Sequence, residues 1–439
     1  MKRLSLLLCT VIATWPLAAQ EGPWTLAKCI DYAIANNLSV RQGAINVEEN
    51  EIAVHTAKSA RLPGVYGSAS QNFSFGRGLT ADNTYANTNT TSTGFTVGAD
   101  VPIFQGFRIK HDIALKELNL AAATADLERV RDDIRTSVAA AYVQILYNME
   151  ILSVAREQVK IDSLHVERLE QMLASGKVSA AELAQQKASL AQSRYQLTQA
   201  KNNLQLSRLD LAQLLELPSP EGFYIAVPGA DETGIQLLPS PEIIYADAVG
   251  ERPAIVAEER RLDAADKQVE LAKSALYPSL SLSGGVGSNF YTSSGTHAPS
   301  FAEQMKNNFS QSVGLSLSIP IFNRFSTRNS IRSAQLSREN QQLQLETAKK
   351  SLYKEIQQAW YSAVAAQEHF RSSEQVVESA RESFDLVSAK YENGKANITE
   401  FNEAKNNLVR AVSDMVQARW QQVYQTRLLD FYRGGELSF

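Results

Sequence analysis

The 439-residue sequence is poor in residues that interrupt secondary structure, with only 13 prolines and 22 glycines. Several globular domains of ordinary size would need more turn residues, so this scarcity predicts long helices or strands. Cysteine is scarcer still: only Cys29 lies beyond the first 20 residues, which excludes an intrachain disulfide if that segment is removed. The five histidines show no metal-ligand spacing, and we expect neither a metal nor another cofactor.

An excess of one charge is also lacking. The formal net charge of −4 gives no electrostatic reason to expect nucleic-acid binding. Beyond the N-terminal segment, no run reaches the 18 or so consecutive apolar residues that a membrane-spanning helix requires. If the protein enters a membrane, it must do so with strands. No Ser/His/Asp arrangement or Gly-rich phosphate loop is present in a usable context, and we expect no enzymatic activity.

Residues 1–20 have the features of a secretory signal peptide. Two basic residues precede an apolar run, and the small residues Ala18 and Ala19 follow it, as at a cleavage site. The mature protein is therefore predicted to be exported. A lipid anchor on Cys9 is an alternative, but the bulky Leu8 stands where a lipoprotein signal has a small residue.

The chain contains an internal repeat, which fixes the architecture before local propensities do. Three segments of the first half recur in the second: 57–63 as 272–278, 102–104 (Pro-Ile-Phe) as 320–322, and Gly176-Lys177 as Gly394-Lys395. The offset is 215 residues for the first segment and 218 for the other two. A constant offset after the Pro-Ile-Phe motifs indicates continuous helices, because one inserted residue would rotate everything after it by about 100°.

Both repeats follow one predicted plan. The first, residues 21–217, has a helix over 25–61, strands over 64–75 and 93–104, and a long helical hairpin over 106–217 that turns near residue 176. The second, residues 241–433, has a helix over 241–276, strands over 279–291 and 309–322, and a hairpin over 324–432 that turns near residue 394. Residues 218–240 form a linker, in which 223–227 could add a small strand, and 434–439 form a C-terminal tail.

The predicted strands alternate strictly between apolar and small polar residues. In the fourth strand Val313, Leu315 and Leu317 alternate with Ser312 and Ser316. This period is typical of barrel strands with one face to lipid and the other to a watery interior. A soluble β-sandwich is the alternative, but long polar connectors between the paired strands, over 76–92 and 292–308, favour outer-membrane strands.

The helical hairpins are unusually long. Each first helix spans roughly 70 residues without proline, which corresponds to about 100 Å. Apolar residues repeat every seven positions at Ile113, Leu120, Leu127 and Ile134, as in helices that pack lengthwise. Four strands cannot close a barrel, and open edges are not tolerated in lipid. The predicted fold class is therefore a mixed α/β membrane protein, a trimer with a 12-stranded barrel continued by a helical barrel.

The sequence resembles the TolC-type outer-membrane efflux protein family over essentially the whole mature chain. The resemblance lies in Trp24-Thr25-Leu26 with Ala33 and Asn37, the segment 57–63, the duplicated Pro-Ile-Phe motifs and the two Gly-Lys pairs. It implies a homotrimeric exit duct in the outer membrane of a Gram-negative bacterium, extending into the periplasm. The implied partners are a periplasmic adaptor (membrane fusion) protein and an inner-membrane pump or ABC exporter, in a tripartite efflux pump or a type I secretion system.

The resemblance also implies a gate at the periplasmic hairpin tips. Acidic residues just beyond the second tip match Glu400 and Glu403, and the family's links between hairpins match Tyr391 and Glu182. A basic residue of the family's pattern is replaced by Ala396, with a lysine one position earlier. The tips themselves, where contact with the adaptor is implied, are Gly176, Lys177, Gly394 and Lys395.

Two alternatives remain open at this level. Glu400 and Glu403 could be solvated acids that favour a helix N-terminus through its dipole. The chain could also be a periplasmic coiled-coil adaptor or scaffold, or an exported hydrolase. The duplication favours the duct, because adaptors have one helical hairpin, and no converging polar site suggests a hydrolase.

Overall fold

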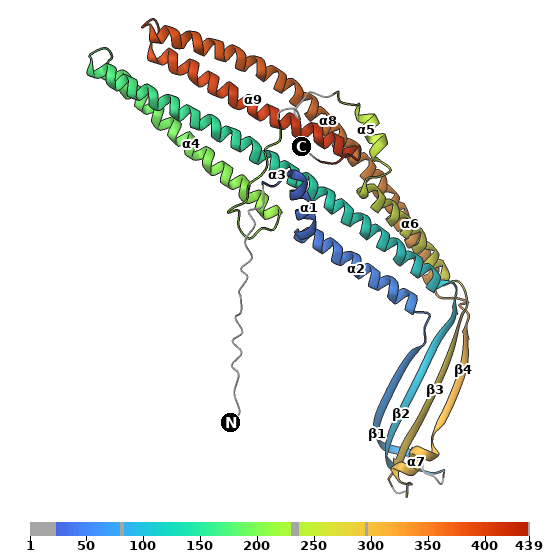
Figure 1. Ribbon diagram of the computed structural model, residues 1–439. Helices are drawn as coiled ribbons and strands as arrows, with labels where there is room; N and C mark the ends of the chain where they lie inside the picture. The colour runs from blue at the N-terminus through green and yellow to red at the C-terminus, as the bar shows by residue number, and fades with distance from the viewer. Residues whose placement is uncertain (1–22, 80–82, 230–236, 295–296, 438–439) are drawn as a thin grey trace, which may run out of the picture. The chain divides into compact units, whose positions relative to one another are not determined.

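The computed structural model describes residues 23–79, 83–229, 237–294 and 297–437 (Figure 1). The predicted signal peptide and the end of the predicted tail lie outside the described residues. The chain forms two compact units. Unit 1 comprises the described residues within 1–38, 132–244 and 356–439, and unit 2 comprises those within 39–131 and 245–355.

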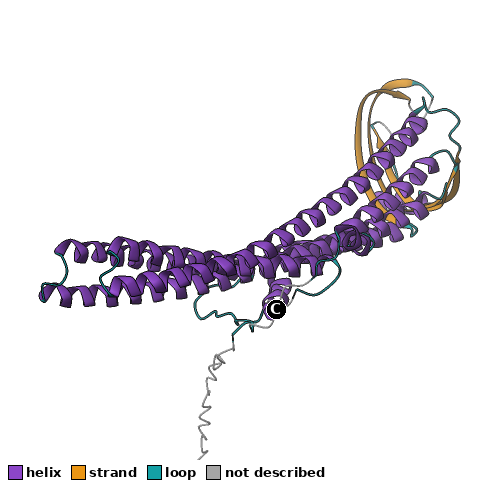
Figure 2. Ribbon diagram, turned by 90° about the horizontal axis from the view of Figure 1, so that it is seen from above, coloured by secondary structure: helices purple, strands orange, loops and turns teal. Residues whose placement is uncertain are grey.

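Unit 2 contains a single antiparallel sheet in the order β1-β2-β3-β4. The strands are β1 (Gly64–Leu79), β2 (Tyr85–Gln105), β3 (Ser279–Ser293) and β4 (Ser310–Ser318). β1 and β2 come from the first repeat and β3 and β4 from the second, and the pairing of β2 with β3 joins the repeats, with Val97 opposite Val286. The sheet curves along its length (Figure 2).

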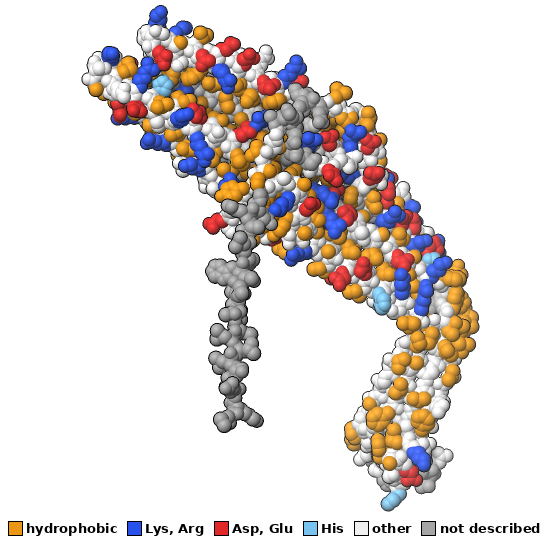
Figure 3. Space-filling view, viewed as in Figure 1, with side chains coloured by type: hydrophobic (Ala, Val, Ile, Leu, Met, Phe, Trp, Pro, Cys, Tyr) orange, Lys and Arg blue, Asp and Glu red, His pale blue; other side chains and the backbone are white. Residues whose placement is uncertain are grey.

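One face of the sheet is apolar and open. Val65, Phe75 and Val313 are 71%, 76% and 84% exposed. In space-filling view hydrophobic side chains gather over the strands, whereas the charged side chains concentrate over the helices (Figure 3). The apolar residues of neighbouring strands lie opposite each other, as Ala69 and Phe95 do, so the period-two pattern places them on the same face.

Several strand boundaries differ from the predicted ones. β1 runs to Leu79 and β2 starts at Tyr85, so most of the predicted loop 76–92 is strand. The threonines of this segment are β-branched, and such residues are favoured in β-strands. β4 ends at Ser318 instead of residue 322, because Ser318 pairs with Ser279, the first residue of β3, and the ladder has no further partner there.

The predicted connector 292–308 contains a short helix, α7 (Phe301–Asn307), which the sequence pattern did not predict. The Gln304 side chain accepts a hydrogen bond from Tyr291 N (2.9 Å) and donates one to Tyr291 O (3.0 Å). The Asn308 side chain donates to Asn289 O (2.6 Å). These side chains satisfy the edge of β3 beyond the shorter β4, where an unpaired ladder would otherwise remain.

The corner from strand to long helix has the same geometry in both repeats. Gly106 and Phe107 have φ values of 60° and 65°, and Arg324 and Phe325 have 55° and 62°. The phenylalanine after each corner meets the Pro-Ile-Phe phenylalanine edge-on, with ring centroids 5.3 Å apart in the first repeat and 5.5 Å in the second. A Cβ on Gly106 would lie 2.4 Å from the carbonyl oxygen of Ser274, so only glycine fits there.

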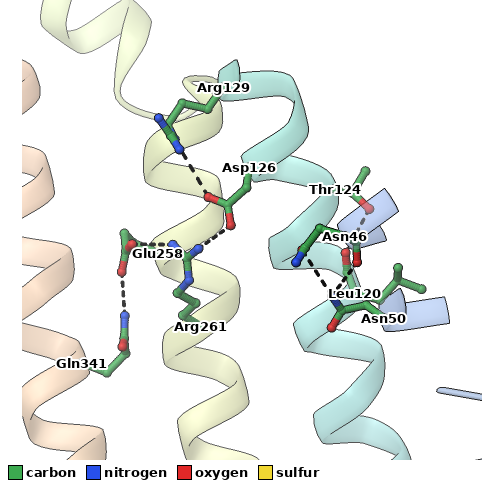
Figure 4. A network of polar contacts seen from close by, with 9 residues as sticks. All are labelled: Asn46, Asn50, Leu120, Thr124, Asp126, Arg129, Glu258, Arg261 and Gln341. Carbon is green, nitrogen blue, oxygen red and sulfur yellow. Dashed lines mark hydrogen bonds and ion pairs between the residues drawn. The ribbon is translucent and has the colours of Figure 1, made fainter. Parts of the chain in front are cut away.

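The helices of unit 2 are α2 (Leu38–Ser59), α6 (Pro253–Ser274) and the first parts of α3 (Arg108–Ala174) and α8 (Ser326–Glu392). A polar network links three of them (Figure 4). Arg261 of α6 pairs with Asp126 of α3 and with Glu258, and Gln341 of α8 donates to Glu258 (2.6 Å). The network ties the two repeats together within this unit.

Unit 1 contains α1 (Leu26–Asn36), α4 (Ala180–Leu214), α9 (Ile398–Tyr432) and the remaining parts of α3 and α8, and the boundary between the units falls within α5 (Pro241–Ala248). α4 returns beside α3 and α9 beside α8, which makes two antiparallel hairpins (Figures 1 and 2). α3 also contains a stretch long and apolar enough to cross a membrane, of which 44% is buried inside the protein. Core helices pass the same test, and Val138 and Leu146 are accordingly 0% and 1% exposed.

Both predicted N-terminal helices of the repeats are broken. The helix predicted over 25–61 is interrupted at Asn37, which is extended and donates its side-chain amide to Leu214 O at the end of α4 (3.1 Å). The helix predicted over 241–276 is interrupted between Ala248 and Pro253. Proline starts a helix well but cannot continue the preceding one.

The linker is held to the start of the chain. The predicted small strand over 223–227 forms a single bridge, between Ile225 and Trp24. The buried hydroxyl of Tyr142 donates to Ala226 O (2.6 Å), and its oxygen also lies 3.1 Å from Trp24 O. Tyr142 thus fastens both segments to α3.

Gly106→Ala should prevent normal assembly, because the new Cβ meets backbone that cannot move easily. We expect a loss of about 3 kcal/mol or more. Gly176→Ala is the matched control: its φ is +72° with no atom within 4 Å, so it should cost only about 1–2 kcal/mol. The yield of folded protein in outer-membrane fractions and its thermal melting in detergent measure both. Equal losses for the two variants would contradict the explanation.

Candidate functional site

The two long hairpins turn at glycines in left-handed conformation. Gly176 and Gly394 have φ values of 72° and 69°. At each tip the following lysine N–H reaches back to the helix, from Lys177 to Met172 O (2.9 Å) and from Lys395 to Lys390 O (2.8 Å). These are Schellman motifs, in which glycine ends a helix without strain.

The returning helices α4 and α9 both start with reciprocal caps. Ser179 Oγ accepts from Glu182 N (3.2 Å), and Glu182 Oε2 accepts from Ser179 N (3.3 Å). Asn397 Oδ1 accepts from Glu400 N (2.9 Å), and its side-chain amide donates to Glu400 Oε1 (2.8 Å). Two predicted site residues, Glu182 and Glu400, therefore also stabilise the starts of their helices. The Glu400 side chain remains exposed.

The first turns of α9 have opposite buried and acidic faces. Ile398 and Phe401 are 4% and 0% exposed and Lys405 is 2% exposed, at spacings that place them on one face. Glu400 and Glu403 are exposed and lie on the other side of the helix. The buried face formed by Ile398, Phe401 and Lys405 thus directs the two carboxylates to the opposite, exposed side.

Phe401 is enclosed by three aromatic rings from two other helices. Its ring centroid lies 4.6 Å from His165 of α3, 5.0 Å from Tyr391 in a stacked arrangement, and 5.6 Å from Phe384 of α8. Tyr391 was predicted as a polar link between the hairpins, and it also forms one side of this aromatic cluster. The cluster was not predicted, because more than 200 residues separate His165 from the other three rings along the chain.

A cavity of about 570 Å³ lies between the two tips. It brings together most of the predicted site residues: Lys177, Glu182, Tyr391, Gly394, Lys395 and Glu400 line it. Gly176 and Glu403 do not line it. Ala396, where the family pattern has a basic residue, lines it as well.

The links between the hairpins differ from the predicted pair. No hydrogen bond between Tyr391 and Glu182 is present among the described residues, since the Glu182 carboxylate caps α4. The two are nevertheless close: burial, and then the charge of Glu182, raise the pKa of Tyr391. The contacts that do span the hairpins here are an ion pair between Arg168 and Glu392 (3.0 Å) and a hydrogen bond from Gln185 to Thr399 (3.3 Å).

Farther along α9 a buried ion pair joins it to α3. Lys405 Nζ lies 2.5 Å from Asp162 Oδ1, and the two side chains are 2% and 1% exposed. Burial alone would raise the pKa of the Asp162 carboxyl. Hydrogen bonds from Lys405, Ser193 and Gln158, with the charge of Lys405, instead hold that pKa below its usual value. In the sequence Lys405 looks like any solvated lysine of a long helix, so no local signal reveals the pair.

Among the described residues, no group of three or more His, Cys, Asp or Glu side chains is arranged to hold a metal ion. The arrangement at the tips is one of charged, cap-forming and aromatic side chains between two hairpins. It is suited to a movable contact between helices.

Asp162→Asn should make the protein less stable at neutral pH by about 3 kcal/mol, because it leaves Lys405 buried without its counter-charge. The lowered pKa means that the carboxylate stabilises the fold above the ordinary carboxyl pKa of about 3.9, and that this contribution declines below that value and is lost as pH falls through the lowered pKa of Asp162. The difference between the denaturation midpoints of the two proteins should therefore be constant near neutral pH and narrow between about pH 4 and pH 3. A constant gap over that range would refute the assignment.

Comparison with known proteins identifies relatives along nearly the whole chain. The model of the family described as outer membrane efflux protein matches residues 29–216 and 244–435. The outer membrane efflux protein BepC of Brucella suis is 22% identical over 94% of this chain and 85% of its own length. The outer membrane protein OprJ of Pseudomonas aeruginosa is 22% identical over 93% of this chain and 83% of its own length.

Solved structures share the fold. The outer membrane protein VceC of Vibrio cholerae superposes with a TM-score of 0.77 at 21% identity, covering 94% of this chain and 97% of its own. The outer membrane channel MtrE of Neisseria gonorrhoeae, solved in an open state, gives a TM-score of 0.75 at 20% identity, covering 93% and 90%.

Proposed function

Because the chain belongs to the outer membrane efflux protein family, we propose that three copies of it form one channel that crosses the outer membrane and extends into the periplasm. The observation that carries the proposal is the four-stranded sheet of unit 2, which has an apolar face and two outer edges without a partner among the described residues. In lipid such edges require another chain.

Three copies are favoured by the number of strands. Two copies would give eight strands, a barrel whose interior is filled by side chains. Three give 12 strands and leave a water-filled channel. The apolar face of the sheet then meets lipid, and the small polar residues of the other face line the interior. Closed cyclic symmetry of this kind is usual for identical subunits.

The hairpins of unit 1 are the proposed periplasmic part. α3 and α8 each have 67 residues, so each is about 100 Å long. Six hairpins around a threefold axis would continue the barrel as a helical tunnel. Their tips, at Gly176, Lys177, Gly394 and Lys395, would meet a periplasmic adaptor protein and through it an inner-membrane pump or ABC exporter.

The proposed gate is formed by Glu400 and Glu403. Both are exposed on the face of α9 opposite its buried residues. Six such carboxylates near the axis would act as an acidic ring that favours cations. Glu182, which lines the same tip cavity as Glu400, and Tyr391, which stacks on Phe401, would hold the hairpins together beside that ring.

The channel itself needs no catalytic residue or cofactor. Movement of substrate would be driven by the inner-membrane partner, and the duct would supply only a path to the outside. The runner-up interpretation, a periplasmic adaptor or scaffold, is replaced by the family assignment.

Assembly can be tested separately from gating. Native mass spectrometry of the detergent-extracted mature protein should give three times the chain mass, and heat should release the monomer. A folded monomer that remains soluble without detergent would overturn the proposed barrel.

The gate can be tested in planar bilayers. Glu400→Gln with Glu403→Gln should reduce the preference for cations and weaken block by a trivalent cation about tenfold, because the acidic ring is lost. Glu368→Gln is the matched control, an exposed acid on α8 that does not line the tip cavity. If the double variant conducts and is blocked as the control is, these residues do not form the constriction.

A further inference from the structure

We infer that the buried pair of Asp162 and Lys405 positions the gate carboxylates, by fixing α9 against α3 and α4 at one point. Because it concerns Glu400 and Glu403, this role rests on the proposed function. Neither member of the pair lines the tip cavity. No motif or spacing in the sequence predicts that these two residues form a buried pair.

Lys405 uses all three of its N–H donors inside the protein. Its Nζ bonds to Asp162 Oδ1 on α3 (2.5 Å), to Ser189 Oγ on α4 (3.1 Å) and to Asn402 Oδ1 on α9 (3.2 Å). A lysine has three donors and no acceptor, so its hydrogen-bonding capacity is satisfied here. One side chain thus connects the second hairpin to both helices of the first.

Asp162 is equally saturated. Besides Lys405, Oδ1 accepts from Gln186 Nε2 (3.2 Å), and Oδ2 accepts from Ser193 Oγ (2.6 Å) and Gln158 Nε2 (3.0 Å). Four donors from three helices therefore converge on a single buried carboxylate. Convergence of this kind on one buried carboxylate favours a single arrangement of the helices around it.

The pair allows α9 only one register. A rotation of α9 by one residue, about 100°, would carry Lys405 away from Asp162, and a slide of one turn would do the same. Either movement would leave two buried charges without partners, which is far more costly than exchanging apolar contacts. Buried polar groups are used in this way to specify register in packed helices.

The gate residues share the same continuous helix. Glu403 lies two residues before Lys405 and Glu400 five residues before it, about 3 Å and 8 Å along the axis. The direction in which both carboxylates point is therefore set by the anchored lysine. Loss of the anchor would let them turn away from the axis without unfolding α9.

Nearer the tip, the polar contacts between hairpins are exposed. The side chains of Arg168 and Glu392 are 49% and 53% exposed, and the hydrogen bond from Gln185 to Thr399 is also exposed. Exposed pairs contribute little to stability. The buried polar contact between α9 and the first hairpin is thus the one at Lys405, whereas the first turn of α9 is held by the apolar packing of Phe401.

The test replaces the pair and follows two properties. In assembled channels, Asp162→Leu with Lys405→Met should weaken block by a trivalent cation about tenfold, although both gate carboxylates are intact. Hydrogen exchange measured by mass spectrometry should accelerate at least tenfold over residues 398–409, and little over residues 415–430. A merely structural pair would leave the cation block unchanged.

A second ion pair between the same helices provides the control. Glu150 of α3 and Arg419 of α9 pair about four turns farther from the tip, with both side chains 30% exposed. Glu150→Gln with Arg419→Met should leave block and tip exchange as in the unmodified channel. The inference is overturned if both double variants behave alike, or if exchange accelerates along the whole of α9.

Two further comparisons keep the outcome decisive. Asp162→Asn with Lys405→Gln, which leaves no buried charge unpaired, replaces the apolar double variant if that does not assemble, and the same results are expected. If the variant without Glu400 and Glu403 carboxylates keeps normal block, the proposed gate is wrong. The exchange pattern then still decides whether Lys405 anchors α9.

Discussion

Backbone hydrogen bonding in lipid is the constraint on which the rest of this structure depends. A sheet of four strands satisfies its inner ladders but leaves two edges that no water can satisfy inside a bilayer. The chain therefore cannot complete its own membrane domain. Where the edge of β3 extends beyond β4, side chains of Gln304 and Asn308 take over the missing ladder, which shows the same demand met locally.

The helical part follows a second constraint, the register of long helices. The constant 218-residue offset between repeats persists from the strand ends to the hairpin tips, because insertions in a packed helix would rotate every later side chain. The buried pair of Asp162 and Lys405 applies the same principle between hairpins. The first turns of α9 then combine a rigid buried face with an exposed acidic one.

Much of the architecture could be predicted from the sequence, and the family and the fold class are confirmed. Period-two alternation, the proline-poor runs and the Gly-Lys pairs are local signals. The break at Asn37 was missed because its partner, Leu214, lies 177 residues away. Lys405 was missed for the same reason. The cap between Ser179 and Glu182 could have been found, since Ser-x-x-Glu before a helix is a known signature.

The corner at Gly106 has a consequence for assembly. It packs on Ser274 and Tyr277, which belong to the second repeat, and the equivalents of these two residues in the first repeat are Ser59 and Leu62. The matching corner at Arg324 follows β4, whose outer edge has no partner among the described residues. In a ring of three, the next copy would supply it, so that six quasi-equivalent corners alternate between contacts inside a chain and contacts between chains. The corner contact made within each chain would then be made again between chains, and association of the subunits would complete the fold.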